Sequence, residues 1–347
     1  MSNQTACING ISYYLPEKLL TNQDLNREHP DWSVDKISQK TGISQRHIAG
    51  ENEYSSEMAL KAIDIFFSEH AVDRNSIDFL LLCTQSPDYL LPTTACILQN
   101  KANLPKSCGA LDFNLGCSGY IYGLGLAKGL VETGQAKNVL LVTSETYSKF
   151  IHYKDKSNKT LFGDASAVTF ITSQPDENYF YAKIGDFVYS TDGSGYESLI
   201  VRNGRMKGSK LEAQDQLDEN GNFVKNDDFL YMDGQAIFNF TAFEIPPLIN
   251  KAVDRNSLKS DDIDLFIFHQ ANVYMLDFVR NRCKIPAEKF YISMQDVGNT
   301  VSSTIPIALK RSIDDKTLNF NTRNILLAGF GVGLSMGAVV LRYFSPY

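Results

Sequence analysis

The sequence lacks several patterns that define whole classes of protein. Its six cysteines are dispersed, and no two form a CxxC pair, so neither a zinc-binding motif nor a disulfide framework is indicated. Basic residues are outnumbered by acidic ones, which leaves a net charge of −7. Nucleic-acid-binding proteins usually present a basic face. These deficits argue against a metal-binding, disulfide-stapled or nucleic-acid-binding protein.

Apolar targeting and membrane segments are also scarce. The N-terminal segment has no basic stretch followed by a long apolar one, so we expect no signal peptide and a cytoplasmic location. The one membrane-like stretch, residues 325–341, is uncharged but interrupted by Gly329, Gly331, Gly333 and Gly337. This pattern predicts two buried strands joined by a glycine turn and no membrane span.

What the sequence does contain is an internal repeat. The segment IDFLLLCTQ from Ile77 resembles IDLFIFHQ from Ile263, and NVLLVTSE from Asn138 resembles NILLAGFG from Asn324. Both pairs are 186 positions apart (77 to 263 and 138 to 324). Repeated supersecondary units keep their spacing in this way. The pentapeptide VDRNS precedes the first segment of each copy and is interpreted as part of the same repeat.

The repeat predicts an α/β chain of two similar halves, residues 1–175 and 176–347, joined near 173–181. Within the second half, residues 201–229 are rich in Gly, Asn, Asp and Lys. A loop this long in a compact domain is usually functional or mobile. Two interpretations stay open for it, a solvated insertion and a lid over a site.

One cysteine stands where an apolar strand gives way to a helical segment. Cys117 lies between Gly116 and Gly119, and a helix N-terminus should lower the pKa of its thiol. The flanking glycines allow a tight turn and let a bulky group approach the backbone. The other five cysteines lack this setting and are interpreted as buried thiols.

The repeat predicts a meeting point for three polar residues. It places Asn299 near the start of a helix related to the one after Cys117, and His269 ends an apolar strand. If the halves pack face to face about a pseudo-twofold axis, all three residues converge. Taken singly, His269 would ordinarily be a structural histidine, and Asn299 would ordinarily be a turn or N-cap residue.

Six motifs, taken together and in their order along the chain, resemble those of one known family. KTGISQRHIA, LGCSGY, FGDASA, HQAN, GNTVSS and GFGVG resemble the β-ketoacyl-acyl-carrier-protein synthase III branch of the thiolase superfamily. The resemblance implies the thiolase fold, a five-layer α/β/α/β/α sandwich of duplicated halves, normally as a homodimer. It implies decarboxylating Claisen condensation of an acyl thioester with a malonyl thioester, in fatty-acid or related lipid and secondary-metabolite biosynthesis. No cofactor or metal is implied; the substrates are coenzyme A or acyl-carrier-protein (ACP) thioesters.

The resemblance also implies a role for individual residues. Cys117 would be the acylated nucleophile, and His269 and Asn299 would donate hydrogen bonds to the enolate oxygen formed on decarboxylation. The backbone N–H groups of Cys117 and Val332 would form the oxyanion hole. Leu91 would be donated across the dimer interface as a gate to the acyl pocket. The implied substrate-binding residues are Leu91, Gly234, Phe238, Asn272, Phe330 and Gly331.

The chain departs from the family pattern at the positions that bind coenzyme A or the acyl carrier. A gap-free comparison puts Lys36 where the family has a tryptophan that stacks on adenine, with Trp32 four residues earlier, and Lys156 stands for the stacking arginine. Asn239 and Tyr274 replace basic residues that dock the acyl carrier. These differences leave the carrier and the acyl donor open. Two alternatives remain, an acyltransferase of the same fold acting on an oxygen or nitrogen acceptor, and a non-catalytic partner subunit.

Overall fold

A computed structural model describes residues 4–204, 206–208 and 212–345. Its main feature is a nine-stranded sheet. In spatial order the strands are β13 (Leu265–Phe268), β14 (Asn324–Gly331), β15 (Ser335–Phe344), β8 (Tyr181–Thr191), β1 (Cys7–Tyr14), β7 (Ala165–Thr172), β6 (Asn138–Glu145), β4 (Phe79–Cys83) and β5 (Gly109–Phe113). The strands β4, β5 and β6 run parallel, as do β13 and β14, and the other neighbours pair antiparallel.

The sheet is built from two runs of strands with the same order. The run β1-β7-β6-β4-β5 is matched by β8-β15-β14-β13, and an isolated parallel bridge from Phe266 to Phe290 takes the place of β5 in the second run. Phe79 pairs with Val139, and Leu265 pairs with Ile325. The spacing of 186 residues read from the sequence therefore corresponds to one pairing register used twice.

Hydrogen bonds explain why an aspartate and an asparagine recur in the repeat. Asp78 Oδ2 accepts the Asn138 backbone N–H (3.0 Å), and Asp264 Oδ2 accepts that of Asn324 (2.9 Å). Each asparagine side chain in turn donates to a backbone carbonyl just before the neighbouring strand (2.9 Å in both halves). These side chains fix the start of the central parallel pair in each half.

The pentapeptide VDRNS, however, is not part of the structural repeat. Its first copy contains the 3-10 turn Arg74–Ser76, whereas its second copy ends helix α7 (Gly234–Arg255) and continues into the following turn. The counterpart of the first turn is Ser260–Asp262, which lies 186 positions after it. The interpretation of the pentapeptide was wrong because five identical letters carry no information about the element that contains them.

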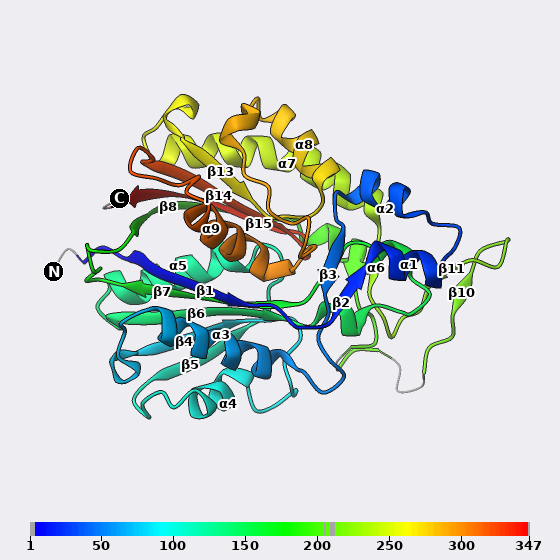
Figure 1. The fold of residues 1–347 in the computed structure, drawn as a ribbon, viewed down its shortest axis with the longest axis horizontal. Coiled ribbons are helices and arrows are strands. Elements are labelled where there is room, and N and C mark those ends of the chain that lie inside the picture. Colours follow the sequence, from blue (N-terminus) through cyan, green and yellow to red (C-terminus); the bar gives the residue numbers. More distant parts are fainter. Residues whose placement is uncertain (1–3, 205, 209–211, 346–347) are drawn as a thin grey trace.

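Helices complete five layers (Figure 1). α5 (Gly119–Glu132) and α9 (Thr304–Asp314) lie between the two halves of the sheet and contact strands of both. α3 (Ser55–Glu69) and α4 (Thr94–Lys101) cover the outer face of the first half, while α7 and α8 (Val273–Arg282) cover that of the second. The predicted α/β/α/β/α arrangement is confirmed.

Small residues let α5 fit between the two halves of the sheet. Its Gly123 faces β6 so closely that an added Cβ would lie 2.6 Å from Leu141 Cδ1. Tyr120, Ile121, Leu124, Ala127 and Val131 fill the central core at helical spacing. The segment 325–341 forms the antiparallel pair β14 and β15, as predicted. Among the described residues, no helix is both long and apolar enough to cross a bilayer.

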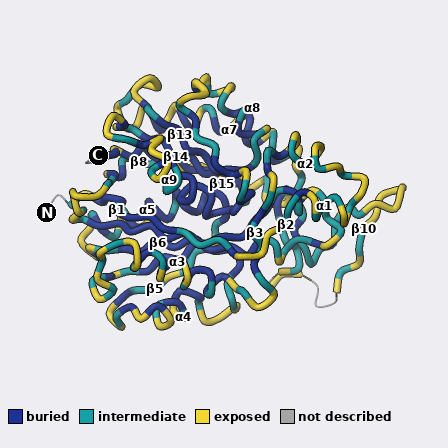
Figure 2. The backbone as a smooth tube through the Cα atoms, in the orientation of Figure 1, coloured by how far each residue is buried: buried dark blue, intermediate teal, exposed yellow. Residues whose placement is uncertain are grey.

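One end of the molecule carries short elements outside the layers (Figures 1 and 2). They are β2 (Leu19–Thr21), α1 (Asn22–Glu28), α2 (Val34–Thr41), β3 (Gln45–His47), α6 (Lys156–Lys159), β9 (Leu199–Ile200), β10 (Gln216–Leu217), β11 (Phe223–Lys225) and β12 (Tyr231–Met232). The hairpin of β10 and β11 belongs to the 201–229 segment. It is anchored where His152 stacks on Phe223 (4.4 Å between ring centroids) and Lys154 pairs with Asp215 (2.8 Å).

Candidate active site

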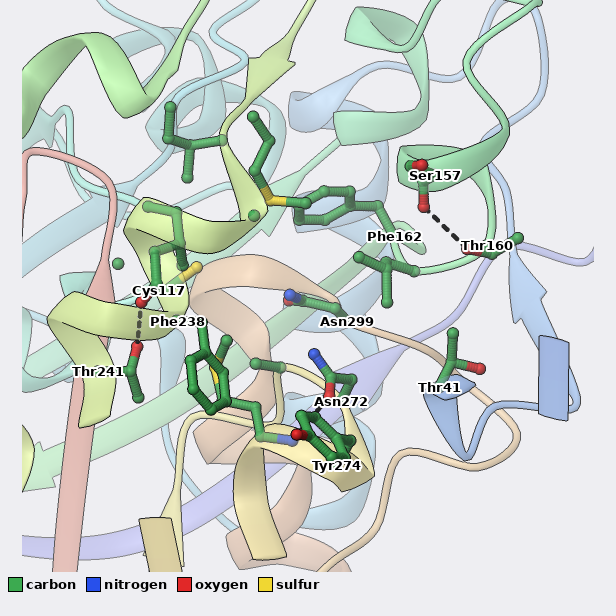
Figure 3. A pocket seen from close by; sticks show the side chains of 18 of the residues that line it. Thr41, Cys117, Ser157, Thr160, Phe162, Phe238, Thr241, Asn272, Tyr274 and Asn299 are labelled. Carbon is green, nitrogen blue, oxygen red and sulfur yellow. Dashed lines mark hydrogen bonds between the residues drawn. The ribbon is translucent and has the colours of Figure 1, made fainter. Parts of the chain in front are cut away.

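A cavity of about 660 Å³ brings together the three polar residues that the repeat predicts to converge. Cys117, His269 and Asn299 line this active-site cavity. In Figure 3 the Cys117 sulfur and the Asn299 carboxamide face the same space, between Phe162 and Phe238. Five of the six residues expected at the substrate also line it, namely Gly234, Phe238, Asn272, Phe330 and Gly331.

The Cys117 turn is pressed against β14 at its glycines. The Gly119 N–H donates to Gly116 O (2.7 Å), which closes the turn before α5. A Cβ added at Gly331 would lie 2.8 Å from Cys117 Cβ and 3.1 Å from its sulfur. One added at Gly329 would lie 2.8 Å from Cys117 O. The glycines of β14 are therefore required by the close approach of the cysteine.

The expected lowering of the Cys117 pKa is not found. Burial raises the pKa of the Cys117 thiol well above its usual range, and the nearby Glu145 carboxyl raises it further. The side chain is only 6% exposed, so a thiolate would lose most of its hydration. Desolvation is the largest influence on the Cys117 pKa. The resting side chain is a thiol that must give up its proton during acylation.

Glu145 is a buried acid that sequence reasoning missed. It ends β6, and its carboxyl accepts the Gln85 backbone N–H (3.1 Å) and the hydroxyls of Ser86 (3.3 Å) and Ser302 (2.9 Å). Burial raises its pKa to about 8. The available signal was a single acidic residue closing a strand whose centre, residues 139–142, is apolar. Glu145 ties the segment after β4 to the segment that follows Asn299.

His269 follows β13 and is held from α9. Its Nδ1 lies 2.8 Å from Thr304 Oγ1, and the Phe330 ring stands edge-on to it. Burial lowers the pKa of His269 to about 3, so the ring is neutral and carries one N–H. Thr304 Oγ1 also lies 3.0 Å from the Val301 carbonyl oxygen, so its single hydroxyl proton is donated either to that carbonyl or to Nδ1. When it is donated to Nδ1, the ring proton is on Nε2. The ring can then donate a hydrogen bond without acting as an acid.

Asn299 is clamped by residues 161–163. Its backbone N–H donates to Leu161 O (2.9 Å), and its carbonyl accepts the Gly163 N–H (3.0 Å). The side-chain Oδ1 accepts the Val301 backbone N–H (2.9 Å). Because a backbone N–H requires an acceptor, the carboxamide orientation is fixed and the NH₂ group is left as the free donor. Asn299 is therefore built as a hydrogen-bond donor at the cavity.

The residues that line the cavity correct the gap-free comparison, which aligned Lys36 with the family's tryptophan. Trp32 lines the cavity, and Lys40 lines it too, with its ammonium 5.3 Å from the centre of the Trp32 ring. Lys36 is not among the lining residues. A tryptophan is thus present at the mouth, because the backbone turns at Trp32, whose N–H donates to His29 O (2.9 Å), before α2 begins.

An outer cavity of about 530 Å³ adjoins the first and shares Trp32, Ser157 and Met232 with it. The hairpin of the 201–229 segment forms one wall through Asn222, Phe223 and Val224. Lys154 and Lys156 also line this cavity. Both are ion-paired, Lys154 with Asp215 (2.8 Å) and Lys156 with Asp31 (2.5 Å). The insertion therefore shapes a chamber beside the active-site cavity.

Leu91 and Val332 lie outside the set of cavity-lining residues. Leu91 is 83% exposed, and it extends an exposed apolar run that begins with Tyr89 and Leu90. Its role as a gate from a neighbouring subunit stays a prediction. Val332 contacts the Cys117 turn, because a Cβ on Gly116 would lie 2.7 Å from Val332 Cγ1. The oxyanion hole also stays a prediction.

Comparison with known proteins agrees with this geometry. Residues 111–193 match the family described as 3-oxoacyl-[acyl-carrier-protein (ACP)] synthase III, and residues 253–343 match its C-terminal region. A β-ketoacyl-[acyl-carrier-protein] synthase III of Clostridium perfringens is 34% identical over 96% of this chain and 98% of its own length. A solved 3-oxoacyl-(acyl-carrier-protein) synthase III superimposes with a TM-score of 0.92 at 43% identity, covering 97% of this chain and 99% of its own.

A second solved relative, from Burkholderia xenovorans LB400, gives a TM-score of 0.87 at 31% identity, over 99% of this chain and 95% of its own. The five layers and the convergent cysteine, histidine and asparagine define an enzyme of the thiolase fold. Within that class, the chain belongs to the 3-oxoacyl-[acyl-carrier-protein] synthase III family.

Proposed function

We propose that the protein catalyses the decarboxylating condensation of an acyl thioester with a malonyl thioester, as a β-ketoacyl-ACP synthase III in fatty-acid or related lipid biosynthesis. The observation that carries the proposal is the convergence of Cys117, His269 and Asn299 on one cavity, with the Asn299 amide held as a donor. Family membership supports the same reaction.

In the first half-reaction the Cys117 sulfur attacks the acyl thioester carbonyl. A bond forms between sulfur and the acyl carbon, the bond to the carrier sulfur breaks, and the thiol proton leaves with the departing carrier. The backbone N–H groups of Cys117 and Val332 would hold the tetrahedral oxyanion. The glycines of β14 allow the cysteine turn to lie directly against that strand.

In the second half-reaction the malonyl thioester loses CO₂. The electrons of the broken C–C bond form an enolate, whose oxygen accepts hydrogen bonds from His269 and Asn299. A neutral imidazole is suited to this step, since it donates without protonating the carbanion. The carbanion attacks the acyl group, a C–C bond forms, and the sulfur of Cys117 leaves and regains a proton. The product is a 3-oxoacyl thioester.

The proposal is tested by separating the two half-reactions. Incubation with an acyl thioester should place the acyl group on Cys117 alone, as seen by mass spectrometry of peptides. Asn299→Ala and His269→Ala should still acylate but should condense slower by a factor on the order of 10². Condensation by Asn299→Ala at the parent rate would instead favour acyl transfer to an oxygen or nitrogen acceptor.

For the carrier, we propose that the pantetheine arm common to coenzyme A and ACP is the main determinant of binding. The ion pairs of Lys154 and Lys156 support this, because nucleotide phosphates would compete with Asp215 and Asp31. Acyl-CoA should therefore acylate Cys117 only a few times faster than acyl-pantetheine. Asp31→Asn should widen that ratio by freeing Lys156, and an unchanged ratio would contradict this assignment.

We also propose a homodimer. β5 is at the edge of the sheet, and its Leu111 is exposed, as are Tyr89, Leu90 and Leu91. An exposed edge strand beside apolar side chains favours association with another copy. Light scattering coupled to size exclusion should give twice the chain mass, and a monomer at micromolar concentration would refute the proposal.

A further inference from the structure

Arg46 belongs to the motif KTGISQRHIA, to which the proposed reaction assigns no role. It lies on β3 and is fully buried. Its Nη1 donates to Asn22 Oδ1 (2.6 Å), and its Nη2 donates to the backbone carbonyl of Thr160. Nε has no hydrogen-bond partner. Within residues 4–204, 206–208 and 212–345, no carboxylate lies within ion-pair distance of Arg46, so its charge is held by neutral groups alone.

A buried guanidinium without a counterion is costly, and burial lowers the pKa of Arg46 only to about 10, so it stays protonated at neutral pH. An apolar side chain of similar volume would avoid that cost. The presence of arginine therefore calls for a task that an apolar residue does not perform. Its planar fork can reach two acceptors on different segments at once.

One of those segments, the one that contains Thr160, also holds Asn299. The stem of Arg46 passes beside two glycines, since a Cβ on Gly298 would lie 3.3 Å from its Cγ and one on Gly163 would lie 3.2 Å from its Cβ. Gly298 precedes Asn299, and Gly163 donates to the Asn299 carbonyl. Thr160, the acceptor of Nη2, precedes Leu161, which accepts the Asn299 N–H.

We propose that Arg46 is a positioning residue for the decarboxylation step, acting through the clamp on Asn299. Arg46 is not among the residues that line the active-site cavity. By donating to Thr160 and packing against Gly298, it keeps residues 160–163 in register with the segment that carries Asn299 and so keeps the Asn299 NH₂ directed at the cavity. The inference rests on the proposed role of Asn299 in decarboxylation.

The test compares Arg46→Met and Arg46→Lys with the parent in both half-reactions. Acyl-Cys117 formation should stay within about twofold of the parent, whereas condensation should fall at least about tenfold in Arg46→Met, because small misplacements of a reacting group are costly. Arg46→Lys should lose less, since an ammonium can still satisfy one acceptor. Arg74→Met is the control, because Arg74 also donates to a backbone carbonyl, that of Ala102 (2.7 Å), outside this clamp.

A double variant supplies the decisive readout. If Arg46 acts through Asn299, adding Arg46→Met to Asn299→Ala should not slow condensation further. Equal loss of acylation and condensation, no loss of condensation, or multiplying losses in the double variant would each overturn the inference. If Arg46→Met fails to fold, Arg46→Lys is subjected to the same comparison. Parent-rate condensation by Asn299→Ala alone would instead refute the proposed function, and the inference with it.

Discussion

Replacing Gly331 by alanine tests how closely β14 must approach the nucleophile. The added Cβ would lie 2.8 Å from Cys117 Cβ and 3.1 Å from its sulfur. Carbon atoms in contact prefer about 3.5–4.0 Å, so a displacement of about 1 Å must be shared between β14 and the Cys117 turn. Overpacking of this kind costs about 1–3 kcal/mol of unfolding free energy. A misplacement of about 1 Å can slow a reaction by a factor on the order of 10².

We therefore expect Gly331→Ala to lower the denaturation midpoint and to slow acylation of Cys117 at least about tenfold. Both are measurable, the first by chemical denaturation and the second by quenched-flow mass spectrometry with an acyl thioester. Gly129→Ala is the matched control. Gly129 lies inside α5, and its added Cβ would meet no atom within 4 Å, so alanine there should stabilise the helix by about 0.5–1 kcal/mol.

The two glycine variants thus move stability in opposite directions. If Gly331→Ala matches Gly129→Ala in midpoint and acylates at the parent rate, the contact between β14 and Cys117 is looser than the structure shows. The reasoning about the glycines of the GFGVG motif would then fail.

Three further predictions concern Glu145, Thr304 and Leu91. The pKa of Glu145 is raised to about 8 in the folded protein, so the contribution of this residue to stability is complete below about pH 4.5 and is lost as the pH rises to about 8. Glu145→Gln should therefore lose less stability between pH 5 and pH 8 than the parent. Parallel profiles of unfolding free energy against pH for the two proteins would contradict this. Thr304→Val removes the hydrogen-bond partner of His269 Nδ1 and should slow condensation about tenfold while acylation is retained, because a buried hydrogen bond is lost. Thr304→Ser should restore the rate of condensation. Condensation by Thr304→Val at the parent rate would show that Thr304 does not orient His269. Leu91→Phe should shift acylation toward two-carbon primers. In the parent, acylation efficiency should rise about fourfold for each added carbon until the pocket is full, since each buried methylene contributes about 0.8 kcal/mol. Identical chain-length profiles for the two proteins would show that Leu91 is not a gate.

Sequence alone determined the features that depend on local pattern. The apolar strands, the 186-residue spacing and the glycine-flanked cysteine were all readable, because strand burial and tight turns are set by neighbouring residues. The convergence of Cys117, His269 and Asn299 was predictable from the repeat, since two similar halves packed face to face bring the ends of their strands and the starts of their helices together. The failure of VDRNS shows the limit of letter identity without knowledge of the element around it.

Only the tertiary structure decided the environment of the site. The pKa of Cys117 is raised because the two halves exclude water from it, which no local pattern records. Trp32 reaches the cavity through the path of the chain before α2, and Arg46 meets Asn299 through contacts between residues more than a hundred positions apart. Desolvation and long-range packing depend on every segment that surrounds a side chain. They therefore become defined only when the whole chain is folded.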